Sequence, residues 1–275
     1  MYKKTLVVLI SILVFSCNYT DKSKRVKKTN HLEKKSNKIK ERYIDSLLLE
    51  KYLTKALKLA KNNIYSNKYY NEYTSTTDSL YNVTTKVLID NLFEDNKKNV
   101  LIKRKRTWDE IIDIYKVDTN FNLVQIKHKV QSNMTYVNDS IYDINGDGYK
   151  DYVLKWYPNS GCCLANTYDV SLYNKKNTNL NKEIEFINPT FFVKEKIIRG
   201  FTYGQPNDVD LYKYRWNKYK IDTIEYIMHN YNNKNEFIRS KKEKYSATEK
   251  DGQILKKIPK EYYKIKDFAW VIGKY

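Results

Sequence analysis

The chain has 275 residues, a formal net charge of +19 at pH 7 and only seven glycines. So few glycines leave little room for phosphate-binding or dinucleotide-binding loops, and no nucleophile-elbow motif occurs. Tyrosine is abundant, with 27 copies, and this amphipathic side chain suits the half-buried faces of β-sheets.

The first sixteen residues have the pattern of a secretory signal. Lys3 and Lys4 precede an apolar run, Leu6 to Phe15, that is too short to span a membrane. The run ends in Val14-Phe15-Ser16-Cys17, which resembles the signal-peptidase box of bacterial lipoproteins. This resemblance implies that Cys17 becomes the mature N-terminus and carries a lipid. The alternative is an ordinary signal peptide with Cys17 as a bystander.

Residues 17–40 are predicted to be a lipidated cysteine followed by a disordered tether. From Asn18 to Lys40 the chain carries nine Lys or Arg and two acids, and it has almost no apolar content with which to build a core. This segment either lies on anionic lipid headgroups or acts as a solvated spacer. Net charge alone would suggest nucleic acid, but an exported lipoprotein does not normally meet it, so no nucleic-acid partner is expected.

Residues 41–65 are assigned to an amphipathic helix, and residues 66–275 to one β-rich domain. From Glu41 to Asn62 apolar residues recur at helical spacing, which predicts a helix that packs on the domain or on a partner. The stripe consists of Ile44, Leu48, Tyr52, Ala56 and Leu59. Tyr65 to Tyr81 has no clear period and is expected to form a loop.

Strands are predicted for most of the remaining chain, because short β-branched and aromatic runs alternate with turn residues. Asn122 to Val130 alternates most clearly, with Val124, Ile126, His128 and Val130 expected on one face. Val83 to Ile89 fits either a strand or a short helix. The sequence therefore predicts a mainly β fold, an antiparallel meander that is barrel-like or partial-propeller-like. The further predicted strands are 100–102, 110–117, 140–142, 152–157, 167–173, 182–187, 194–203, 211–216, 221–228 and 234–239.

Residues 143–151 place an oxygen donor at nearly every second position, which predicts a calcium site. Ca²⁺ takes about six to eight oxygen ligands, and Gly146 and Gly148 permit the positive φ angles that wrapping an ion requires. The expected ligands are the side chains of Asp143, Asn145, Asp147 and Asp151 and the main-chain carbonyl of Tyr149. The alternatives are an Asn-Gly or Asp-Gly turn with solvated acids, or a set of catalytic carboxylates. The alternate spacing suits one ion better than a substrate.

The loop starts like an EF-hand, but its twelfth position is Leu154 where an EF-hand has Glu. The pattern D-x-N-G-D-G-x-x-D leads straight into a predicted strand. In this it resembles the FG-GAP-type calcium loop of integrin-like β-propellers. A single such loop, with no visible repeat, argues against a full propeller.

Cys162 and Cys163 are adjacent in the sequence. A disulfide between neighbours closes a strained ring, but an exported chain tends to pair its cysteines. A vicinal disulfide is the first expectation, with two buried thiols or a reactive pair as alternatives. No zinc-ligand motif accompanies them, and the three histidines are isolated in the sequence. The basic run Lys103 to Arg106 with Trp108 fits an anionic-ligand patch or an exposed strand face.

The segment from Thr107 through Trp216 resembles a family of poorly characterised Bacteroidota lipoproteins, for which no activity is agreed. The stretches that carry this resemblance are Asp143 to Asp151, Trp156 to Cys163, Asn188 to Phe191 and Leu211 to Trp216. In its layout and single calcium loop, the chain is also similar to calcium-containing periplasmic lipoproteins that inhibit lysozyme-like enzymes.

Together these features predict a non-enzymatic binding module at the cell envelope. The module would be held by its N-terminal lipid at the periplasmic face or the outer-membrane surface. One Ca²⁺ would stabilise its β domain, and its partner would be an envelope protein or glycan. The alternatives are an inhibitor or immunity protein against a cell-wall hydrolase, and an envelope glycan hydrolase.

Overall fold

A computed structural model describes residues 46–77, 81–159, 161, 163–233, 235–243 and 252–274. The chain divides into two compact units, Met1–Leu57 and Lys58–Tyr275. The predicted signal peptide and tether, residues 1–40, lie outside the described residues. Within the described ranges, none of the helices combines the length and the apolar character needed to cross a membrane.

Residues 46–62 are helical, in agreement with the predicted amphipathic stripe. Tyr52 and Ala56 on this stripe are buried. Asn63 follows the helix, and its side-chain amide donates a hydrogen bond to the carbonyl of Leu59 at 2.9 Å. In the second unit, the Lys98 ammonium donates to the carbonyl of Ile64 at 2.8 Å, which fixes the chain as it leaves the helix.

The first sheet contains the strands in sequence order, β1-β2-β3-β4-β5. The expected loop from Tyr65 to Tyr81 is wrong, because most of it forms β1, which pairs with β2 along its whole length. Tyrosine and threonine favour strands even without an apolar alternation. The alternative of a short helix for Val83 to Ile89 is also wrong. The strands are β1 Tyr69–Thr77, β2 Tyr81–Asp90, β3 Asn99–Lys105, β4 Asp109–Val117 and β5 Leu123–Ser132.

The predicted alternation of β5 is interrupted by an irregularity opposite Ile114 and Tyr115 of β4. Ile126 packs against the core between the first two sheets, whereas His128 contacts Asp113 on the other face of β4. Ile126 and His128 were expected on one face, and that expectation is wrong. A bulge adds one residue to one strand and so shifts the side chains beyond it to the opposite face.

The second sheet has the order β11-β8-β7-β6. Its strand β7 is buried on both faces: Tyr152 and Leu154 face the first sheet, while Val153 contacts the third. A two-stranded ladder, β9–β10, follows β8. The strands are β6 Tyr136–Tyr142, β7 Asp151–Trp156, β8 Thr167–Ser171, β9 Tyr173–Asn174, β10 Asn179–Leu180 and β11 Ile184–Ile187.

The third sheet runs in sequence order from β12 to β17. Tyr212 and Trp216 of β14 face the second sheet, and Leu211 faces a C-terminal segment that covers the other side. The elements are β12 Pro189–Phe192, η1 Val193–Glu195, β13 Ile197–Phe201, β14 Leu211–Asn217, β15 Lys220–His229, β16 Phe237–Ser240, β17 Gln253–Leu255, η3 Lys260–Lys264 and α2 Phe268–Val271.

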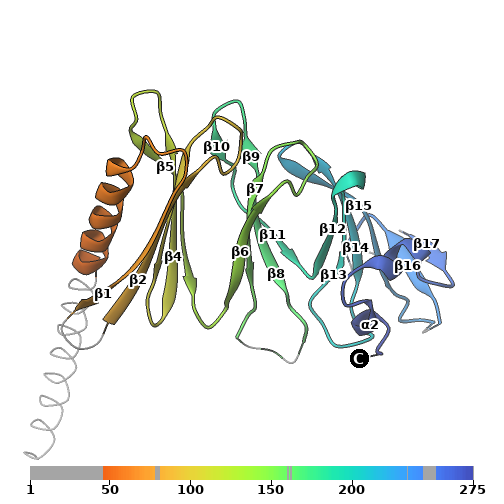
Figure 1. Cartoon of the computed structure of the whole chain (residues 1–275). Helices are drawn as coiled ribbons and strands as arrows, with labels where there is room; N and C mark the ends of the chain where they lie inside the picture. The colour runs from red at the N-terminus through yellow and green to blue at the C-terminus, as the bar shows by residue number, and fades with distance from the viewer. Residues whose placement is uncertain are drawn as a thin grey trace, which may run out of the picture. The chain divides into compact units, whose positions relative to one another are not determined.

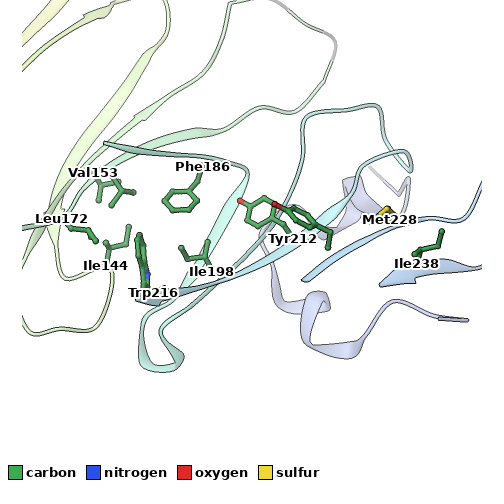
Figure 2. Close-up of a cluster of buried hydrophobic side chains, with 11 residues drawn as sticks. Ile144, Val153, Leu172, Phe186, Ile198, Tyr212, Trp216, Met228 and Ile238 are labelled. Atoms are coloured by element: carbon green, nitrogen blue, oxygen red, sulfur yellow. The ribbon is translucent and has the colours of Figure 1, made fainter. Parts of the chain in front are cut away.

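Apolar side chains from neighbouring sheets hold the second unit together. Figure 1 shows the three sheets following one another along the chain. Figure 2 shows the cluster between the second and third sheets, where Val153 and Phe186 face Ile198 and Trp216. A separate cluster joins the first and second sheets. The mainly β, antiparallel prediction is confirmed, and the described strands form open sheets rather than a closed barrel.

Replacing Leu154 with alanine is expected to destabilise the protein by about 2–5 kcal/mol, because the side chain is fully buried between two sheets. Val137→Ala is the matched control, since Val137 is 47% exposed and surface changes usually stay within about 0.5 kcal/mol. Urea unfolding of both variants measures the difference. Equal losses would show that β7 is not the buried centre of the unit.

Candidate metal centre

The predicted calcium loop connects β6 to β7 and is anchored at its start in the protein core. Ile144 is fully buried in the cluster between the second and third sheets (Figure 2), and Asn145 is 3% exposed. Gly146 and Gly148 have φ angles of 74° and 90°, as the sequence predicts. The tight turn is therefore built by the two glycines and held by an apolar anchor.

Asp143 organises the turn through its carboxylate. Its Oδ1 accepts the backbone N–H of Gly146 at 2.6 Å and that of Asp147 at 3.2 Å. Its Oδ2 accepts the N–H of Gly148 at 2.8 Å. Three consecutive amides thus point at one carboxylate, which bends the loop around Asp143.

Asp151 closes the loop from the first position of β7 and is fully buried. It accepts the N–H of Tyr173 at 2.8 Å and that of Ile144 at 3.1 Å. Burial raises the pKa of Asp151 to about 7, the two N–H donors oppose the rise, and the negative charges of Asp147 and Asp143 add to it. Burial therefore makes the anion of Asp151 less favourable than that of an exposed aspartate, and a nearby positive charge would favour it.

The remaining predicted ligands lie on the same turn. Asp147 accepts the N–H of Tyr149 at 2.9 Å and the side-chain amide of Asn145 at 3.1 Å. The Asn145 carbonyl oxygen accepts the N–H of Asp147 at 3.1 Å. An ionised carboxylate offers about four lone-pair sites, so Asp143, Asp147 and Asp151 each keep acceptor capacity beyond these bonds. The donor set is all oxygen, which matches a hard cation.

No ion pair reaches the three loop carboxylates from any described residue. Among all the described residues, no three acidic, histidine or cysteine side chains lie close enough together, as they are arranged, to hold a metal ion. The carboxylates turn instead toward the amides of their own loop. The chemistry of the donors fits Ca²⁺, and their negative charge is not neutralised by the protein.

The neighbours of the loop come from distant parts of the sequence, which the sequence analysis missed. Lys150 donates its N–H to the carbonyl of Phe93 at 3.0 Å. The ring of Tyr173 stacks on Phe93 at 5.4 Å and lies 6.2 Å from that of Tyr149. Lys175 donates to the Tyr149 hydroxyl at 2.6 Å. No local sequence signal marks these contacts, because they arise from the stacking of the sheets.

The other predicted sites have different outcomes. Cys17 and Cys162 lie outside the described residues, so lipidation and the vicinal disulfide stay predictions. Cys163 is described and is 5% exposed. Its carbonyl accepts a hydrogen bond from the Tyr157 hydroxyl at 3.1 Å.

The basic run is largely neutralised by acids of β4 and β6. Lys103 pairs with Asp139, and Arg106 pairs with Asp109 at 2.6 Å. Arg104 is only 3% exposed and pairs with the fully buried Asp113 at 2.6 Å. Three of the four basic residues are therefore paired with acids, whereas Lys105 and Trp108 are exposed.

Asp113 is the centre of a polar group on β3, β4 and β5 that the sequence did not indicate. Besides Arg104, it accepts hydrogen bonds from Gln125 at 2.9 Å and His128 at 2.7 Å. His128 remains half-exposed, with 54% of its side chain accessible. These contacts satisfy a buried carboxylate, which explains how a charged group is tolerated there.

Comparisons with family models, with curated proteins and with solved structures returned no match for this chain.

Alanine substitutions at the two loop glycines are expected to differ. An added Cβ at Gly146 would lie 2.8 Å from the Val193 carbonyl oxygen, whereas at Gly148 it would meet nothing within 4 Å. Both changes strain a positive φ angle, at a cost of about 1 kcal/mol or more, and Gly146→Ala adds a steric clash. Thermal melts of the two variants test whether Gly146→Ala lowers the melting temperature more than Gly148→Ala. A larger loss for Gly148→Ala would contradict this loop geometry.

Proposed function

We propose that this protein is a lipid-anchored binding module of the cell envelope, in which one Ca²⁺ held by residues 143–151 fixes a loop of the β domain. The observation that carries the proposal is the buried, uncompensated Asp151, placed with Asp143 and Asp147 on one turn. A cation on this turn would satisfy the carboxylates that the protein leaves without a counter-charge. No catalytic role is assigned to these acids.

The ion would be held by the side chains of Asp143, Asn145, Asp147 and Asp151 and by the main-chain carbonyl of Tyr149. Its contribution would be structural: it would neutralise the loop and hold the start of β7 in place. Because Ile144 and Asp151 are buried within the second unit, this stabilisation would extend into the core between the sheets.

An exposed aromatic pair beside the first sheet supports a role in binding. The rings of Tyr65 and Phe121 lie 4.8 Å apart, and the side chains are 73% and 48% exposed. Phe121 has a φ of 59°, and the Asp118 carboxylate holds its turn by accepting the N–H of Asn120 and of Asn122, each at 2.8 Å. Exposed aromatics on a rigid turn are typical contact residues for a protein or glycan partner.

A calcium titration tests the proposed ion. The melting temperature of the full chain in EDTA is expected to rise with added Ca²⁺, since a ligand at about one hundred times its Kd adds about 2.7 kcal/mol to the folded state. Asp147→Ala should abolish the rise, whereas Asp222→Ala, an exposed acid on β15, should retain it. A melting temperature that does not change with Ca²⁺ would show that the loop is a hydrogen-bonded turn and not an ion site.

Fractionation tests the proposed anchor separately. In a bacterial host that processes lipoproteins, the wild-type chain should sediment with membranes, because an N-terminal lipid buries its acyl chains in the bilayer. Cys17→Ser removes the thiol that would carry the lipid and should release the protein to the soluble fraction. Equal membrane association of the two forms would contradict the anchor without affecting the calcium proposal.

A further inference from the structure

The first sheet ends in a long strand whose outer edge has no partner among the described strands. Among the described strands, β1 pairs only with β2 and stands at the end of the sheet order. Its nine residues, Tyr69–Thr77, are all in register with β2, with no shift. In an antiparallel pair, every second residue of an edge strand directs its N–H and C=O away from its neighbour. This edge therefore offers a row of backbone donors and acceptors.

The other described edge strands all carry a feature that discourages pairing. β5 has an irregular register and two lysines, Lys127 and Lys129, that turn inward to Glu183. β6 has a register shift and the inward Asp139. β11 and β12 have four residues each, and β12 begins with proline. β17 has three residues, and β9 and β10 have two.

β1 has none of these features. It contains no proline, lysine or arginine. Its single charged residue, Glu72, is bonded within the sheet, at 2.6 Å to the Tyr70 hydroxyl and 3.5 Å to Lys86. Tyrosine and threonine give the strand high β propensity. A long, regular edge with a single charged residue is a template for another strand.

We propose that β1 pairs with β1 of a second copy of this chain, in antiparallel register about a two-fold axis at Tyr73. This register sets Tyr70 opposite Thr76 and Glu72 opposite Thr74, so no like charges stand directly opposite each other. A symmetric contact of this type is closed, because each copy uses the same edge. The dimer uses the free β1 edge of both copies, so no third copy can add to it in the same way.

The salt dependence follows from the net charge. Each copy carries +19, so two copies repel at long range, and added salt screens that repulsion. Backbone pairing along β1 is hardly screened. Dimerisation should therefore strengthen as ionic strength rises, which is the opposite of an association driven by attraction between charged surfaces.

Two substitutions at Thr74, an exposed position on β1, test the register. Thr74→Lys places an ammonium opposite Glu72 of the second copy, whereas Thr74→Glu places a like charge there. Each pair occurs twice by symmetry, so the dimer Kd should fall about two- to thirty-fold for Lys and rise by a similar factor for Glu. The change in net charge alone predicts the reverse order.

Sedimentation velocity of the full chain over a concentration series, at low and high salt, measures the three forms. The expected result is a monomer–dimer equilibrium, tightest for Thr74→Lys and loosest for Thr74→Glu. A strictly monomeric wild type would overturn the proposal and leave the edge to another segment of the chain or to a different polypeptide. A dimer that neither substitution changes, or that follows the reverse order, would place the contact elsewhere.

Discussion

The arrangement around the loop depends on one buried carboxylate, that of Asp151. It accepts the N–H of Ile144, at the start of the loop, and of Tyr173, at the start of β9. One side chain therefore joins three segments at the point where β7 begins. Away from solvent, an anionic Asp151 is stabilised by these two donors, because burying an unpaired charge is costly. The ionisation of Asp151 is therefore coupled to the folding of this part of the protein.

Strand β7 transmits this constraint to the rest of the second unit. Its alternating side chains belong to two different apolar clusters, so displacing the strand disturbs both sheet interfaces. Polar contacts reinforce one of these interfaces: Lys127 and Lys129 of β5 both reach Glu183, at 2.5 and 2.8 Å. Burial lowers the pKa of Lys127 despite the attraction of Glu183. Ion pairs here give the two sheets a defined alignment, while the apolar contacts supply most of the stabilisation.

Local patterns predicted the strands with apolar alternation and the loop, whose donors all lie within nine residues of one another. They did not predict β1, because its tyrosines, threonines and asparagine lack an apolar face, and strand formation there depends on pairing with β2. The partners of Arg104 and Asp151 were also not predictable, since they are brought together by strand register and sheet stacking. The bulge in β5 is a further example: nothing in the sequence of that strand marks where its faces exchange.

The meander also determines which surface a loop-bound ion could influence. Lys150 bonds to Phe93, and Val117 donates its N–H to the carbonyl of Lys98, at 3.0 and 3.1 Å. The connection between β2 and β3 therefore contacts both the candidate calcium loop and the end of β4, just before the turn that carries Phe121. An ion that orders residues 143–151 would stiffen this shared connection, and through it the exposed aromatic pair. Ordering before contact lowers the entropic cost of binding a partner, so a structural ion can favour recognition without touching the ligand.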